Sequence, residues 1–153
     1  MGSGKSSVGA LAADRAGVDF HDLDRIIEAE TGMSIGELFE QETRFRVVES
    51  RLLPKALQPG AVASLGGGAP MQDENWALIR ERATTVWLDA PFAVLYERIR
   101  HQEHRPLVRY FPEADLEALY QQRRPRYAEA DHRLDATRPV AELAEEVLSL
   151  WSG

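Results

Sequence analysis

Short β-rich runs alternate with amphipathic stretches along the chain, and this alternation limits the possible fold more than any other feature. A helix between two strands makes the strands parallel and covers one face of their sheet. We therefore predict an α/β fold of three layers (α/β/α) around a parallel sheet, formed by a single domain over residues 1–153. The predicted strands are 18–21, 61–65, 84–89 and 133–136, and the predicted helices are 5–16, 23–30, 34–39, 45–57, 75–82, 92–100, 116–128 and 140–151.

Several helix ends carry local signals. Gly17 follows the first helix and predicts its end, because glycine readily adopts the left-handed conformation that closes a helix. Ser34 and Glu37 have the spacing of a capping box, which predicts a helix start. Pro54 predicts an interruption near the end of the helix over 45–57.

The first residues carry the clearest chemical signal. Gly2-Ser3-Gly4-Lys5-Ser6-Ser7 is similar to the second half of a Walker A loop, at the start of a predicted helix. Glycines let backbone N–H groups point inward around an anion, and the helix N-terminus adds a partial positive charge. In such a loop Lys5 reaches the β- and γ-phosphates and the Ser6 hydroxyl binds magnesium. The alternative is a flexible start without function.

Two carboxylates follow the strand predicted over 18–21. Ligands of open α/β sheets bind outside the carboxyl ends of the strands, and Asp22 and Asp24 are placed there. Asp22 is a candidate for magnesium and Asp24 for a substrate hydroxyl. The alternative is that one of them caps the next helix.

Composition excludes several classes of function. The net charge of −7 argues against nucleic acid as a partner. The chain has no cysteine, hence no disulfide and no thiolate metal site, which is compatible with the reducing cytoplasm where we expect the protein. No apolar run approaches the roughly 20 residues of a membrane helix, so we expect no membrane association. The four histidines show no metal-binding spacing.

Six motifs along the chain resemble those of the shikimate kinases, in the order and near the spacing of that family. They are D-L-D-R-I-I-E (22–28), T-G-M-S-I-G-E-L-F (31–39), F-R-V-V-E (45–49), G-G-G-A (66–69), R-P-L (105–107) and R-R-P-R-Y (123–127). The resemblance implies a P-loop fold like that of nucleoside monophosphate kinases, with five parallel strands in the order 2-3-1-4-5. It also implies transfer of the γ-phosphate of ATP, with Mg²⁺, to the 3-hydroxyl of shikimate in aromatic amino-acid biosynthesis, by a monomer.

The same resemblance implies roles for individual residues. Arg46 and Arg123 match the positions that hold the substrate carboxylate, and Asp24 matches the position that contacts the reacting hydroxyl. Arg98 matches the arginine that stacks on adenine, and Arg105 matches the arginine of a lid over 101–113. The substrate-binding segment is 22–57, and substrate approaches the backbone of Gly66, Gly67 and Gly68.

Other interpretations of the arginines stay open at this point. Arg46 has Glu42 and Glu49 at helical spacing, so it can be an exposed arginine in an ion pair. Arg123 has two arginine neighbours, Arg124 and Arg126, and only the motif register selects it.

The chain departs from the family pattern in two places. Residues 40–44 form a shorter segment without the expected glycine, which predicts an altered loop before Arg46. The first Walker A glycine and the central strand would precede Met1. Without that strand, the two strands beside it would have unpaired backbone groups, and each such group would cost about 1–3 kcal/mol. We therefore expect that Met1 is not the native start and that the native chain has about ten more residues, judged from a typical strand of 5–6 residues.

Two other functions remain alternatives. A P-loop kinase of another small polyol acid, such as gluconate, shares the architecture, and the acceptor in an ADP assay separates it. A non-catalytic relative that binds ligand is favoured by the incomplete P-loop, whereas Lys5, Ser6, Asp22, Asp24 and Arg105 together favour the enzyme.

Overall fold

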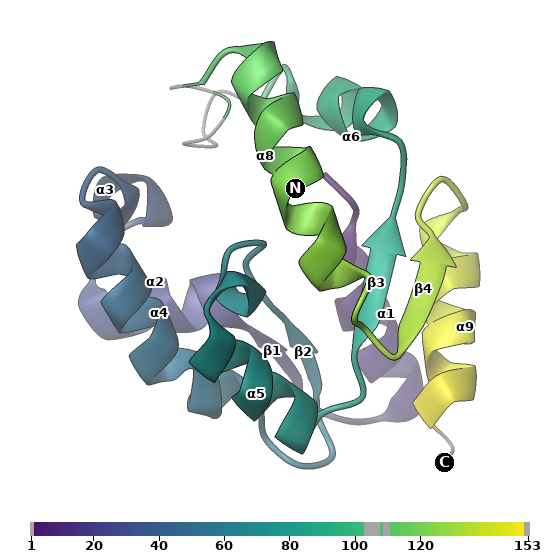
Figure 1. The fold of residues 1–153 in the computed structure, drawn as a ribbon. Helices are drawn as coiled ribbons and strands as arrows, with labels where there is room; N and C mark the ends of the chain where they lie inside the picture. The colour runs from purple at the N-terminus through teal and green to yellow at the C-terminus, as the bar shows by residue number, and fades with distance from the viewer. Residues whose placement is uncertain (1, 103–107, 109–110, 152–153) are drawn as a thin grey trace.

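The computed structural model describes residues 2–102, 108 and 111–151. Four strands form two parallel pairs, with β1 (Phe20–Asp22) beside β2 (Val62–Ser64) and β3 (Val86–Asp89) beside β4 (His132–Asp135). Within these residues the two pairs are separate sheets that share no hydrogen bond. In Figure 1, α5 and α8 lie in front of the strands and α1 passes behind them.

The predicted parallel α/β architecture is confirmed. In the predicted order 2-3-1-4-5, strand 1 lies between strands 3 and 4. If β1 to β4 correspond to strands 2 to 5, this order predicts the two observed pairs, β1 with β2 and β3 with β4. In register, Asp22 is opposite Ser64, and Asp89 is opposite Asp135. The carboxyl ends of paired strands therefore meet at one edge, where the topology places a ligand.

The helices lie close to their predicted positions. Two match the predicted bounds, α1 (Lys5–Ala16) and α9 (Val140–Trp151). The others, together with a short 3₁₀ helix that the sequence did not indicate, are α2 (Leu23–Thr31), α3 (Ile35–Phe39), α4 (Glu42–Ala56), η1 (Ala69–Met71), α5 (Asp73–Arg82), α6 (Phe92–Ile99) and α8 (Glu113–Tyr127).

The predicted helix ends form as their local chemistry requires. Gly17 closes α1 with φ of 67°, in the left-handed region. The capping box is present: the Ser34 hydroxyl accepts from the Glu37 backbone N–H at 3.2 Å, and the Glu37 carboxylate accepts from the Ser34 N–H at 2.8 Å.

The predicted interruption at Pro54 is wrong, because α4 continues to Ala56. Leu53 and Ala56 are fully buried on either side of the proline, so packing outweighs the lost hydrogen bond. Beyond it the Gln58 side chain donates to the Pro54 carbonyl at 2.8 Å.

Two apolar clusters form most of the core. The larger joins α2, α4 and α5 and includes Ile27, Leu53 and Trp76. A second forms where Val8 of α1 packs with Leu134 and Leu143. In the part of the chain that the structure describes, no helix is both long and apolar enough to cross a membrane.

Leu53→Ala is expected to lower the free energy of unfolding by about 2–5 kcal/mol, because it leaves a cavity in the larger cluster. Val47→Ala, in the same helix but at a position that is 66% exposed, is the control and is expected to change it by less than about 0.5 kcal/mol. Urea unfolding of both variants measures the difference. Equal effects would contradict this description of the core.

Candidate functional site

The loop before α1 has the backbone shape of an anion-binding turn. Gly2 and Gly4 have φ of 65° and 82°, in the left-handed region where other residues are strained. Ser3 lies between them, and Lys5 is the first residue of α1. The Val8 N–H donates to the Gly4 carbonyl at 2.9 Å, so the first turn of the helix forms directly after the loop.

Three side chains from three elements meet beside this loop. The Ser6 hydroxyl donates to Asp22 Oδ2 at 2.8 Å and lies 3.3 Å from the Ser64 hydroxyl. Asp22 Oδ1 accepts from the backbone N–H of Asp24 at 3.0 Å, so Asp22 also caps α2. The capping role of Asp22 is therefore confirmed, and its magnesium role stays a prediction. Ser64 was missed by sequence reasoning, although its place at the end of a predicted strand was a signal.

Gly66, Gly67 and Gly68 follow β2 and form a surface that charged side chains approach, here called the glycine floor. A Cβ on Gly66 would lie 3.0 Å from Glu49 Oε1 and 3.3 Å from Asp24 Oδ1. A Cβ on Gly67 would lie 3.0 Å from Arg123 Nη1, and one on Gly68 would overlap the Arg46 guanidinium. The structure thus brings together all the predicted substrate-binding residues around this glycine floor.

Arg46 lies at the floor despite the altered segment before it. Its Nη1 donates to Glu49 Oε2 at 2.7 Å, and its Nη2 is 3.7 Å from Glu42 Oε1. Arg46 and Arg123 also line a cavity of about 550 Å³ together with Gly68. The ion pairs proposed as the alternative role of Arg46 are therefore present, and they hold its guanidinium at this cavity.

Glu49 is a site residue that sequence reasoning treated only as a partner for Arg46. Its side chain is fully buried, and in the described part of the chain its Oε1 has no hydrogen-bond partner. Burial raises the pKa of this carboxyl, and the neighbouring Arg46 opposes the rise only in part. The sequence did contain a signal for this role, because Glu49 is the fifth residue of the F-R-V-V-E motif.

Arg98 connects the first loop to the segment after β4. Its guanidinium donates to the Gly2 carbonyl at 3.3 Å and to the Ala136 carbonyl at 2.9 Å. Ser7 is exposed in the first turn of α1. Arg105, the predicted lid arginine, lies outside the described residues, as does most of the predicted lid.

Comparison with known proteins identifies the family. The family model described as shikimate kinase matches residues 1–151. The chain belongs to the shikimate kinase family. It is 46% identical to a shikimate kinase of Ruegeria pomeroyi over 86% of this chain and 69% of that protein. It is 40% identical to one of Salinibacter ruber over 98% of this chain and 80% of that protein.

A solved relative supports the same assignment. The structure of shikimate kinase from Acinetobacter baumannii in complex with shikimate superposes with a TM-score of 0.91 and 33% identity. The match covers 99% of this chain and 88% of that one. The two-pair strand arrangement therefore belongs to a shikimate kinase fold, and the family uses ATP as a substrate.

The buried Glu49 predicts a pH dependence of stability. The pKa of Glu49 in the folded protein lies above the unfolded value of 4.5. At a pH between these two values, the native state therefore binds a larger fraction of a proton than the unfolded chain does. The stabilisation that this proton provides is complete below pH 4.5 and is lost as the pH rises through the folded pKa of Glu49. Glu49→Gln has no such proton, so its stability relative to the unaltered protein is expected to increase with pH.

Urea unfolding at about pH 5 and pH 8 measures this difference. Glu42→Gln is the matched control, because Glu42 also neighbours Arg46 on α4 but its side chain is 63% exposed. Parallel pH profiles for Glu49→Gln and the unaltered protein would contradict a raised pKa of Glu49.

Proposed function

We infer that this chain transfers the γ-phosphoryl group of ATP to the 3-hydroxyl of shikimate, giving shikimate 3-phosphate and ADP. The observation that carries this inference is the glycine floor, where two arginines and two carboxylates converge. Shikimate carries one carboxylate and three hydroxyls, and its chemistry complements that set. The membership of the family supports the same reaction.

The two arginines are proposed to bind the substrate carboxylate. Arg46 and Arg123 come from α4 and α8 and approach neighbouring glycines of the floor. A guanidinium presents a planar pair of donors that matches a carboxylate better than an ammonium does. Glu49 supports this role, because its hydrogen bond fixes the orientation of the Arg46 guanidinium before substrate arrives.

Asp24 is proposed to orient the reacting hydroxyl and to accept its proton. Its Oδ1 approaches Gly66 at the end of the floor where Glu49 also lies. Phosphoryl transfer depends mainly on positioning and on neutralising charge, so an ordinary carboxylate is sufficient for this role. The backbone of Gly66–Gly68 leaves room for the substrate ring because it carries no side chains.

The loop Gly2–Ser7 is proposed to hold the phosphates of ATP, with Lys5 as the cation on the β- and γ-phosphates. Arg98 is proposed to contact the adenine, and its hydrogen bonds place it between this loop and Ala136. Arg105 is proposed to close over the phosphates and exclude water.

Ser6 and Asp22 are proposed to hold Mg²⁺. Their oxygens already lie 2.8 Å apart, and magnesium prefers one or two carboxylates completed by phosphate oxygens and water. No group of three His, Cys, Asp or Glu that would form a dedicated cage occurs within the described ranges. A bound Mg²⁺ neutralises charge on the transferred phosphate.

We propose that one copy of the chain is sufficient for the reaction, as a single-domain monomer in the cytoplasm. All the residues assigned above come from one chain, with substrate groups from segment 22–57, Gly66–Gly68 and Arg123, and the lid from 101–113. The partner is a small molecule, and neither nucleic acid nor a membrane is required.

The release of ADP from Mg-ATP tests the function. The purified protein is expected to release ADP rapidly with shikimate and at background rate with gluconate or without an acceptor. Turnover with gluconate alone would indicate the other kinase class. A folded protein that binds shikimate, measured by calorimetry, but releases no ADP would indicate a non-catalytic relative.

Arg123→Lys is expected to raise KM for shikimate about tenfold or more, since a hydrogen bond to a charged group is worth roughly 1.5–3 kcal/mol and each 1.4 kcal/mol is tenfold. KM for ATP is expected to stay unchanged. Arg126→Lys is the control, because Arg126 lies on the same helix but pairs with Asp73. Equal KM values for the two variants would contradict the role of Arg123.

A further inference from the structure

Three arginines near the end of α8 have three different destinations. Arg123 approaches Gly67 of the glycine floor. Arg124 pairs with Asp89 at the end of β3, and Arg126 pairs with Asp73 of α5. Consecutive residues of a helix are separated by roughly 100° around its axis. A rotation of α8 about its axis by the angle of one residue would therefore place Arg124, and not Arg123, at the glycine floor.

Apolar packing does little to fix the rotation of this part of α8. Leu116 is the one buried residue of the helix, and it lies in the first half. Arg123, Arg124 and Tyr127 are only partly buried. The orientation of the second half must therefore come from its polar and aromatic contacts.

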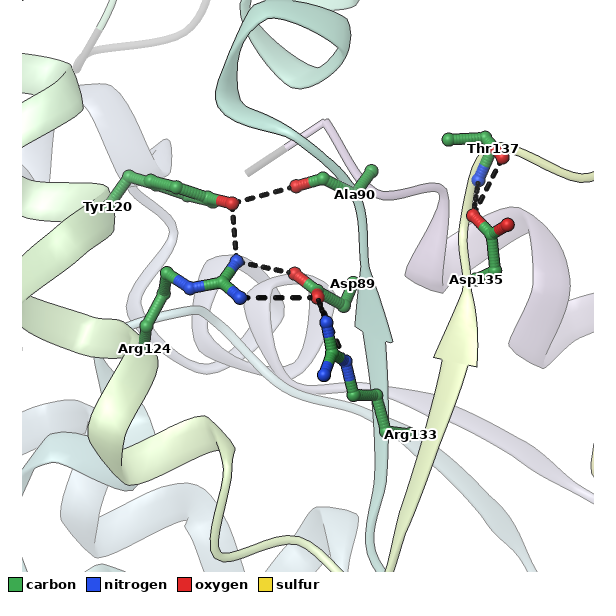
Figure 2. A network of polar contacts seen from close by, with 7 residues as sticks. All are labelled: Asp89, Ala90, Tyr120, Arg124, Arg133, Asp135 and Thr137. Carbon is green, nitrogen blue, oxygen red and sulfur yellow. Dashed lines mark hydrogen bonds and ion pairs between the residues drawn. The ribbon is translucent and has the colours of Figure 1, made fainter.

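One of these contacts joins Arg124 to Asp89. The guanidinium donates from Nη1 to Oδ1 at 2.8 Å and from Nη2 to Oδ2 at 3.4 Å, so both prongs of the fork meet the carboxylate (Figure 2). A two-pronged contact restricts rotation in a way that a point charge does not. Asp89 is itself buried and belongs to a strand, so the anchor is rigid.

Aromatic groups hold the Arg124 guanidinium in this position. Its Cζ lies 5.0 Å from the centre of the Trp87 ring and 5.1 Å from that of Tyr120. The Tyr120 hydroxyl accepts from Arg124 and donates to the Ala90 carbonyl at 2.9 Å (Figure 2). Tyr120 and Arg124, one helical turn apart, thus attach the same face of α8 to the end of β3.

We propose that Asp89 and Arg124 are positioning residues that fix the rotation of α8 and thereby direct Arg123 at the substrate carboxylate. The proposal rests on the role of Arg123 in the proposed function. Arg133 also pairs with Asp89 and serves as the comparison for Arg124. It donates to the same Asp89 carboxylate at 3.0 Å and lies 5.0 Å from Trp87, but it comes from β4 and does not tie α8 to the strand.

Steady-state kinetics of three variants test the proposal. Arg124→Gln is expected to raise KM for shikimate roughly tenfold, which corresponds to about 1.4 kcal/mol of lost binding to the substrate carboxylate. KM for ATP and kcat are expected to change less than twofold. Arg133→Gln removes a cation from the same carboxylate and is expected to leave KM for shikimate within twofold. Arg124→Lys keeps the charge without the fork, gives an intermediate KM, and replaces the first variant if that one does not fold.

A double-mutant cycle separates positioning from a general loss of stability. If Arg124 acts through Arg123, adding Arg124→Gln to Arg123→Gln is expected to raise KM for shikimate no further. Additive effects, an equal effect of Arg133→Gln, or an unchanged KM in Arg124→Gln would each overturn the proposal. Absence of shikimate-dependent ADP release by the unaltered protein would instead overturn the proposed function, and this inference with it.

Discussion

Helix α1 joins two strand pairs that share no hydrogen bond within the described residues. On one side Val8 packs with Leu134 and Leu143, and on the other Gly9 lies so close to the Phe20 ring that an added Cβ would be 2.8 Å from it. The loop before α1 therefore takes its position from both pairs at once. The proposed phosphate contacts of residues 2–7 therefore depend on the position of this one helix.

The substrate half of the site is organised before any ligand arrives. Arg46 is held by the Glu49 carboxylate and lies 5.0 Å from the Phe45 ring, while Tyr127 donates to the Gly67 carbonyl at 2.6 Å. Groups fixed in this way lose little conformational entropy when substrate binds. The fully buried Glu49 is tolerated here because one of its oxygens accepts a hydrogen bond from the Arg46 guanidinium.

The sequence predicted the features whose causes lie within a few residues. The end of α1 depends on Gly17 alone, and the start of α3 on Ser34 and Glu37. The path of α4 through Pro54 depends on burial against distant segments, which no local pattern contains. The same holds for Glu49, whose motif indicates a partner for Arg46 but not its position beneath Gly66. For the three arginines of α8, the motif register selects Arg123, which also lies beside Gly67, and its role toward the substrate stays a prediction.

The glycine floor has a consequence for how such a site diversifies. Each of its three Cα atoms already faces a charged or hydroxyl-bearing group, so a side chain added there would displace that group. A change of the site that keeps the floor therefore has to come from other residues of the cavity lining, among them Met71, Leu119 and Gln122. A ligand that contacts these three residues would reach a part of the site that can change without disturbing the floor.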